Sequence, residues 1–200
     1  MEHWYQLDRP LILASTSPRR SEILSMLGLA FSTRQPALLN EESFVNPARI
    51  EDSLKMLADK KAATVSAAYP EALVLGADTV VWVNGMALGK PRDRAHAQWM
   101  IRQLSGSAHV VYTAIGLRCE SGTYFRQSIG KTVVHFRSVD NVEIDRYLDF
   151  NDYSDKAGAY AIQGRAMAFI DKIDGCYYNV MGLPVSSTLA LISDFVCRKE

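Results

Sequence analysis

An apolar run of four residues, Leu11–Ala14, leads directly into a turn rich in hydroxyl groups and then into a segment of helical periodicity. Ser17 is a favourable N-cap residue, and Pro18 suits the first helical position because its missing N–H would have no intrahelical partner there. This segment predicts a strand, a tight turn and a helix. A strand that feeds a helix in this way is the opening unit of an α/β fold.

The rest of the chain alternates between apolar runs and helical spacing, with turn residues between them. The dipeptide Asn84-Gly85 is a strong signal for a two-residue hairpin. The predictions are, in chain order, a loop over 31–46, a helix from Pro47, strand segments at 73–75 and 80–83, a strand reaching Leu88, a helix from Asp93, a hairpin over 108–136, a helix over 142–150, a strand over 166–173 and a helix over 184–196. We expect a single α/β domain over residues 1–200 around a mixed sheet, because hairpins interrupt the strand-helix-strand rhythm.

Composition limits the classes of function. Lys plus Arg and Asp plus Glu are balanced at 22 each, so no global field favours nucleic acid or an anionic membrane surface. The three cysteines are far apart in sequence, which argues against a disulfide framework or a zinc site. No apolar stretch has the length of a signal peptide core or a membrane span. We therefore expect a cytoplasmic protein without a nucleic-acid or membrane partner.

The turn after the first strand could bind an anion. Ser15, Arg19 and Arg20 lie beside the start of a helix, where unpaired N–H groups and the helix dipole favour negative charge. Phosphate is the ligand that this combination suits best. The alternative is an ordinary capped helix whose arginines are solvated, since helix caps are far more common than phosphate sites.

Asp78 interrupts an otherwise apolar strand and is the strongest single candidate for chemistry. A buried charge without a partner costs several kcal/mol, so this carboxylate should be paired, protonated or bound to a metal. The alternative is an aspartate at the end of a strand that accepts backbone N–H bonds in a turn.

Two further segments carry candidates in loops. Lys90 lies between two breakers, Gly89 and Pro91, and so belongs to a stiff loop, although a surface lysine is the usual explanation of such a residue. Gln163 lies in the run 155–164, whose small residues let the backbone approach a ligand closely, and its amide could read the edge of a base. A tight packed loop is the alternative. The four histidines show no spacing typical of metal ligands.

Five motifs in this order, ILASTSPRR, LGADT, LGKPRD, DKAGAYAIQG and VMGLP, resemble the Maf family of nucleotide pyrophosphatases. The resemblance extends from Leu11 to about Phe195. It implies a Maf/ITPase-like α/β fold, with an elongated mixed sheet flanked by helices and a cleft between two lobes. Members of the family often form dimers, so a homodimer is the assembly that the resemblance implies.

The resemblance also implies the activity, which is hydrolysis of a nucleoside triphosphate to a monophosphate and pyrophosphate. Asp78 matches the proton acceptor that activates water, and Ser15 with Arg19 matches the phosphate-binding turn. Lys61 falls where the family has a cleft lysine, and Lys90 matches the lysine of its GKP segment. The reaction needs this positive charge, because charge on the phosphoryl oxygens must be neutralised.

The same comparison points to a substrate class. Arg19, Thr79 and Gln163 correspond to the trio that the family associates with dTTP and UTP. The subgroup that acts on 7-methyl-GTP has a Trp in the first motif and GSDQ at the second, whereas this chain has neither. Modified pyrimidine nucleotides are a further expected substrate, and modified or purine nucleotides are the nearest rival. A nucleotide-binding regulator of septum formation with little turnover is the alternative from a different class.

A divalent cation, Mg²⁺, Mn²⁺ or Co²⁺, is the expected cofactor. Asp78 and Glu41 supply the hard oxygen ligands that Mg²⁺ and Mn²⁺ prefer. The family has an acidic residue about eight positions after the aromatic residue that corresponds to Phe31, but that position is Leu39 here. Glu41 fits if the loop is two residues longer, and Glu42 is the next choice. All of these expectations require Arg19 and Asp78 to lie near one another.

Overall fold

The fold is described from a computed structural model, which covers residues 5–38, 44–119 and 123–197. The chain divides into two compact units. Unit 1 consists of residues 1–78, 113–129 and 182–200, and unit 2 of residues 79–112 and 130–181. Three of the long strands contribute residues to both units, and each unit is described by itself below.

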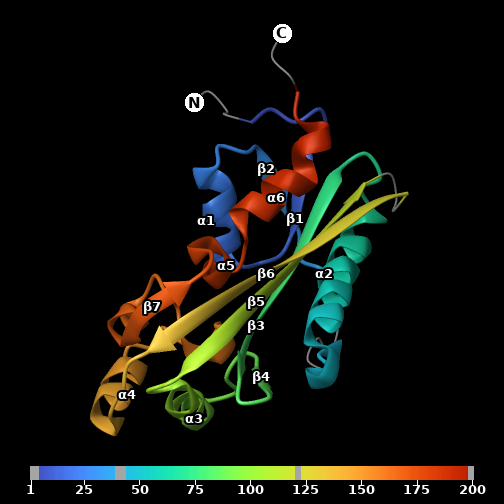
Figure 1. Cartoon of the computed structure of the whole chain (residues 1–200). Coiled ribbons are helices and arrows are strands. Elements are labelled where there is room, and N and C mark those ends of the chain that lie inside the picture. The colour runs from blue at the N-terminus through green and yellow to red at the C-terminus, as the bar shows by residue number, and fades with distance from the viewer. Residues whose placement is uncertain (1–4, 39–43, 120–122, 198–200) are drawn as a thin grey trace. The chain divides into compact units, whose positions relative to one another are not determined.

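The secondary structure is of the α/β class, as Figure 1 shows. The strands are β1 (Leu11–Ala14), β2 (Phe31–Thr33), β3 (Leu73–Val83), β4 (Met86–Leu88), β5 (Ala108–Cys119), β6 (Tyr124–Phe136) and β7 (Ile170–Asp174). They form a 7-stranded sheet in the order β2-β1-β3-β5-β6-β7, with β4 paired to β3. Strand β1 runs parallel to β2 and β3, whereas the β3–β4 and β6–β7 pairs are antiparallel. The expected mixed sheet is therefore confirmed.

The helices are α1 (Pro18–Met26), α2 (Ile50–Ser66), α3 (Arg94–Leu104), α4 (Asn141–Leu148), α5 (Tyr177–Met181) and α6 (Val185–Ile192). Short 3₁₀ segments are η2 (Pro47–Arg49), η4 (Ala157–Ala159), η5 (Arg165–Phe169) and η6 (Ser193–Phe195). Several predicted helix starts are confirmed. Pro18 occupies the first turn of α1, and the Asp93 carboxylate accepts a hydrogen bond from His96 N at 2.7 Å.

The core of unit 1 lies on both faces of its strands. Ile12, Ala14 and Val74 form a buried cluster with residues of α2, including Ala62 and Val65. Side chains alternate between the faces of a strand, so the neighbouring leucines of β1 and β3 point away from α2. These leucines are buried as well, which requires cover on both faces. Figure 1 shows α2 on one side of these strands and α1 on the other.

Unit 2 has a larger apolar cluster. Residues from β3, β4, β5 and β6 meet residues of α3 and α4 and the chain that follows α4. The aromatic members of this cluster are Phe136, Tyr147, Tyr153, Tyr160 and Phe169. The rings of Phe136 and Tyr160 are 5.0 Å apart in an edge-to-face arrangement, and those of Tyr147 and Phe169 are 5.3 Å apart. The segment that carries Gln163 is thus packed on the sheet through aromatic residues on either side of it.

The structure corrects four predictions of local structure. The expected loop contains β2, whose Phe31 pairs with Leu11. The two apolar segments around Asp78 form one continuous strand. The predicted strand over 166–173 begins at Ile170, because Ala166 and Phe169 are buried three residues apart, and this spacing is that of a 3₁₀ turn. Residues Tyr177–Met181 form a helix where no element was expected.

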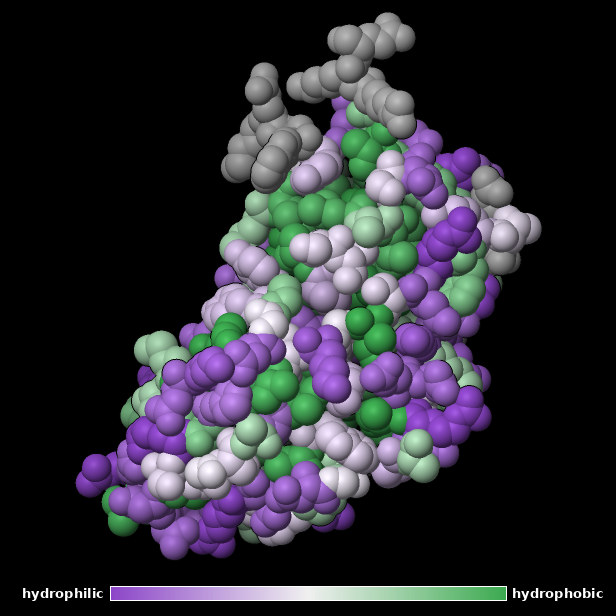
Figure 2. Space-filling view, in the orientation of Figure 1, coloured by the Kyte–Doolittle hydropathy of each residue, from purple (hydrophilic) through white to green (hydrophobic). Residues whose placement is uncertain are grey.

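The surface shows where apolar residues remain accessible. Figure 2 shows hydrophobic residues gathered on the face of unit 1 that includes α6. The sequence of this helix is VSSTLALI, in which five side chains are apolar and the other three carry hydroxyl groups. Among the described residues, no helix combines the length and the apolar character that crossing a membrane would need.

Candidate active site

Asp78 lies on β3 and forms an ion pair with Lys61 of α2. The distance from Lys61 Nζ to Asp78 Oδ1 is 2.6 Å. The lysine side chain is 7% exposed and the aspartate side chain 15%, so both charges are largely removed from water. Attraction between opposite charges is stronger in such surroundings than in bulk water. Of the three states expected for this carboxylate, paired, protonated or metal-bound, the structure shows the paired one, and the partner is the lysine that the family resemblance implies.

The approach of α2 to β3 depends on small residues. A Cβ atom at Gly76 would lie 2.8 Å from the backbone nitrogen of Ala62 and would overlap the carbonyl oxygen of Ala58. Ala58 and Ala62 are themselves fully buried. Only glycine on the strand, facing alanines on the helix, lets the two backbones come this close. Lys61 lies within this tightly packed turn and can therefore reach the strand two residues beyond Gly76.

The hydroxyl-rich turn begins beside the middle of β3, which carries Asp78. In the parallel pair of β1 and β3, Ala14 lies opposite Gly76. Strand β1 ends there and the turn to α1 begins, while β3 continues to Asp78. Neighbouring strands are about 4.8 Å apart. The turn after β1 thus begins next to the part of β3 that carries Asp78, and a site shared by Arg19 and Asp78 stays a prediction.

Ser15 and Arg20 stabilise this turn from inside. The Ser15 hydroxyl oxygen accepts hydrogen bonds from Ser17 N at 3.1 Å and from Arg20 Nη1 at 3.0 Å. Arg20 Nε donates to the carbonyl oxygen of Gly182 at 2.8 Å. Both side chains are buried, with Ser15 6% and Arg20 9% exposed. These bonds fix the start of α1, and the role of Arg20 as a phosphate ligand stays a prediction.

Arg19 and Thr79 are half-buried. Arg19 is the second residue of α1, directly after Pro18, and Thr79 follows Asp78 on β3. The structure thus places Arg19 at the end of the helix where the dipole favours anions.

Unit 2 brings two of the predicted segments together. Gly158 N donates to the carbonyl oxygen of Gly89 at 3.0 Å, which joins the loop of Lys90 to the segment of Gln163. Lys90 and Gln163 are both exposed. Solvent and small molecules can therefore reach both side chains, as binding residues require.

The residues present are compatible with a divalent cation at Asp78. Magnesium is commonly bound by one or two carboxylates, with water and substrate phosphates as the remaining ligands. Asp78 supplies one carboxylate, whose Oδ1 contacts Lys61. No group of three or more His, Cys, Asp or Glu side chains in the described part of the chain is arranged around a common metal position. Glu41 and Glu42 lie outside the described residues, so the second carboxylate stays a prediction.

Sequence reasoning missed how distant segments support the site. The contact between Arg20 and Gly182 joins residues 162 positions apart, and no spacing rule predicts it. The motif VMGLP contributes the backbone carbonyl of Gly182 to this contact. The bond between His109 Nε2 and the Tyr160 hydroxyl, at 2.7 Å, was also not foreseen. A histidine within an apolar strand was the only signal for it.

Comparison with known proteins identifies relatives over almost the whole chain. The chain is similar to a curated protein of Pelotomaculum thermopropionicum that is named dTTP/UTP pyrophosphatase. The two are 42% identical over 94% of this chain and 97% of the relative. The protein of the same name in Symbiobacterium thermophilum has 44% identity over 92% of this chain and 93% of its own length. That of Bacillus pumilus has 40% identity over 92% and 96%.

The family comparison agrees with these relatives. The model described as Maf-like protein matches residues 10–195, which include the turn after β1, the ion pair on β3 and the loops of unit 2. Both the expected fold class and the family resemblance are therefore confirmed. The chain belongs to the Maf family.

Proposed function

We propose that this chain is a nucleoside triphosphate pyrophosphatase that hydrolyses dTTP and UTP to the monophosphate and pyrophosphate. The observation that carries the proposal is the Lys61–Asp78 ion pair beside the hydroxyl-rich turn of β1. It combines a carboxylate that can accept a proton with a helix start that favours phosphate. The names of the relatives from three bacteria support the same reaction.

Asp78 acts as the proton acceptor for the attacking water. A positioned general base contributes about a hundredfold to ten-thousandfold to a reaction rate. The contact between Lys61 Nζ and Asp78 Oδ1 fixes the orientation of the carboxylate. The ammonium group also supplies positive charge next to the place where the phosphoryl oxygens gain negative charge.

The turn after β1 binds the phosphates. Both acceptor positions of the Ser15 hydroxyl are filled by Ser17 N and Arg20 Nη1, so the group keeps its hydrogen for donation to a phosphate oxygen. Arg19 adds a guanidinium group at the start of α1, where it can form two parallel bonds to a phosphate. Lys90, on the loop after β4, adds a further positive charge.

A divalent cation held by Asp78 and by phosphate oxygens would neutralise charge on the triphosphate and make the bound water more acidic. Mg²⁺, Mn²⁺ and Co²⁺ are the candidates, with Glu41 or Glu42 as a second ligand. Gln163 reads the base edge, and Thr79 and Arg19 complete the trio associated with pyrimidine substrates.

The remaining proposals concern the whole protein. Both units belong to one functional domain, since a single family match spans them. The nucleotide pool that such an enzyme cleans lies in the cytoplasm, which is the expected location. A homodimer is the expected assembly, and light scattering at several protein concentrations would measure it.

A panel of nucleotides tests the proposed function. The purified chain is incubated with dTTP, UTP, CTP, ATP and GTP in the presence of Mg²⁺, Mn²⁺ or Co²⁺, and the monophosphate and pyrophosphate are quantified. We expect the highest kcat/KM for dTTP and UTP. Release of inorganic phosphate in place of pyrophosphate would contradict the reaction. Calorimetric binding of dTTP without any product would instead favour a nucleotide-binding regulator.

A further inference from the structure

The segment that carries Gln163 has an unusual backbone. Gly158 and Ala159 are consecutive residues with positive φ, +67° and +60°. Glycine adopts this left-handed conformation freely, but for alanine it costs roughly 1 kcal/mol. A Cβ atom at Gly158 would lie 2.9 Å from the side chain of Val81, so the segment also lies close against β3. Contacts from other elements must maintain this conformation.

Three hydrogen bonds within unit 2 provide such contacts. Gly158 N donates to the carbonyl oxygen of Gly89 at 3.0 Å, and the Tyr147 hydroxyl donates to the carbonyl oxygen of Ala159 at 3.0 Å. His109 Nε2 lies 2.7 Å from the Tyr160 hydroxyl. The third bond is the only one of the three in which both partners are side chains, and it joins the segment to β5.

Burial of His109 costs more free energy than burial of an apolar side chain at the same position would. It is 2% exposed, and its Nδ1 atom has no hydrogen-bond partner among the described residues. Its ring packs edge to face against the rings of Phe136 and Tyr160, with centroids 5.0 and 5.3 Å away. A phenylalanine could fill such an aromatic site without an unpaired nitrogen, whose burial costs about 1–3 kcal/mol. The bond to Tyr160 accounts for a histidine here.

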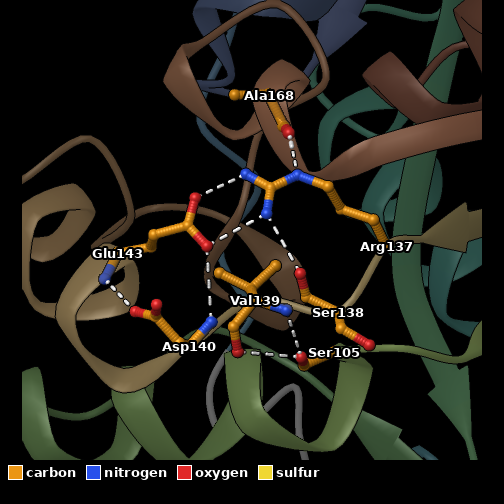
Figure 3. Close-up of polar contacts among 7 residues, drawn as sticks. All are labelled: Ser105, Arg137, Ser138, Val139, Asp140, Glu143 and Ala168. Atoms are coloured by element: carbon orange, nitrogen blue, oxygen red, sulfur yellow. Dashed lines mark hydrogen bonds and ion pairs between the residues drawn. The ribbon is translucent and has the colours of Figure 1, made fainter.

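The far side of Gln163 is anchored independently. Figure 3 shows Arg137 at the centre of a network in which Nε donates to the carbonyl oxygen of Ala168 at 2.8 Å. Its Nη1 and Nη2 atoms donate bidentate hydrogen bonds to the Glu143 carboxylate at 3.0 and 2.6 Å. Gln163 therefore lies between two fixed points, Tyr160 before it and η5 after it, although its own side chain is exposed.

From this arrangement we propose that His109 is a positioning residue for substrate choice, acting through Tyr160 on the placement of Gln163. The proposal rests on the proposed function, because it assumes that Gln163 reads the base. His109 does not touch the nucleotide in this account. It determines where the amide of Gln163 meets the base edge, so its loss affects discrimination between bases more than the rate with any one of them.

The test compares the ratio of kcat/KM for UTP to that for GTP in the wild type and in His109→Phe, Tyr160→Phe, Gln163→Ala and His109→Phe/Gln163→Ala. Partial unfolding lowers both kcat/KM values equally and cancels in the ratio. The loss of a base contact worth about 1–3 kcal/mol corresponds to roughly a 5- to 150-fold change in the ratio. We expect that range for Gln163→Ala and a smaller change, about three- to tenfold, for His109→Phe.

Three comparisons make the result specific. His109→Phe should lower the ratio no further in the Gln163→Ala background, because the two residues act in series. Tyr160→Phe keeps the ring, removes only the hydroxyl group and should reproduce the effect of His109→Phe if the latter folds poorly. His135→Phe, on β6, is the matched histidine control; its Nε2 contacts Asp174 at 3.0 Å, and the ratio should stay at the wild-type value.

The results separate a failure of the proposal for His109 from a failure of the proposed role of Gln163. If Gln163→Ala lowers the ratio while His109→Phe and Tyr160→Phe leave it unchanged, the proposal for His109 is wrong and the proposed function stands. If Gln163→Ala leaves the ratio unchanged, the assignment of Gln163 to the base is wrong, and the role of His109 is overturned with it. An additive effect in the double variant would show that His109 acts by another route.

Discussion

Lys61 Nζ and Asp78 Oδ1 lie 2.6 Å apart at the place where α2 packs directly against β3. Helix and strand meet there without intervening side chains, because Gly76 faces Ala58 and Ala62. The geometry of the ion pair is thus determined by backbone packing and by neither side chain alone. The first two predictions test this dependence from opposite sides.

Lys61→Met should weaken both folding and catalysis. The substitution keeps an apolar side chain of similar length but leaves the Asp78 carboxylate without its cation. Because both side chains are less than a fifth exposed, the free energy of unfolding should fall by roughly 2 kcal/mol or more. Urea denaturation measures this loss. Lys60→Met is the matched control, since Lys60 is the neighbouring lysine of α2 and its Nζ lies over the ring of Phe44. Equal losses in the two variants would contradict a specific role for the pair.

Gly76→Ala should disrupt the site without touching a functional side chain. The added methyl group would overlap the backbone of α2 at Ala58, and a backbone contact cannot be relieved by a rotamer change. We expect a loss of about 3 kcal/mol or more in unfolding free energy, together with reduced turnover, because α2 must move away from Asp78. At Gly89, where a Cβ atom would meet nothing within 4 Å, alanine should change stability by less than about 0.5 kcal/mol. A stable Gly76→Ala protein with wild-type turnover would refute this packing argument.

The two arginines of the first helix should respond differently. Arg20 is 9% exposed and donates to Gly182 and Ser15, so Arg20→Ala should lower the midpoint of urea denaturation. Arg19 is more exposed and is assigned to the phosphates. Arg19→Ala should therefore raise KM for dTTP with less effect on stability. The opposite pattern, with KM sensitive only to Arg20, would exchange the roles of the two residues.

The stability of the fold should fall in acid partly because of His109. Burial, with a smaller contribution from His135, lowers the pKa of His109 from 6.5 to about 4. Between these values the unfolded chain binds a proton that the folded chain does not, so the free energy of unfolding decreases as the pH falls from 6.5 towards 4. This histidine alone should account for about 2 kcal/mol between pH 7 and pH 5.

Urea denaturation of the wild type and of His109→Phe at both pH values measures this contribution. The variant has no imidazole at this position and should show a correspondingly smaller loss in acid. The prediction is wrong if the two proteins lose the same unfolding free energy between pH 7 and pH 5.

Local sequence signals predicted much of the fold because they act over a few residues. The strand 11–14, the start of α1 at Pro18 and the Asn84-Gly85 turn all follow from the preferences of individual residues. Asn84 and Gly85 have φ of +50° and +78°, as such a hairpin turn requires. The short strand β2 was not predicted, because its three residues are held by pairing with β1 and not by a pattern of their own.

The candidate site was predictable where the polarity of one residue differed from that of its neighbours in the sequence. A charge within an apolar strand identified Asp78, but the family resemblance was needed to select Lys61 from the many lysines. The supporting contacts could not be predicted, since each joins segments that are far apart in the chain. Arg20 with Gly182 and His109 with Tyr160 are contacts of this kind. Only the packing of complete elements brings them together.

The turnover of Asp78→Asn with dTTP tests the central claim most directly. Asparagine keeps the shape of the side chain and can still accept a hydrogen bond from Lys61, but it is a far weaker proton acceptor. Asp59→Asn is the matched control, because Asp59 lies on α2, the helix that also carries Lys61, and its Oδ2 accepts a hydrogen bond from Arg118 Nη2 at 2.9 Å. We predict that kcat falls by about a hundredfold or more in Asp78→Asn, with cooperative unfolding retained, and changes little in Asp59→Asn. Wild-type turnover in Asp78→Asn would contradict the account.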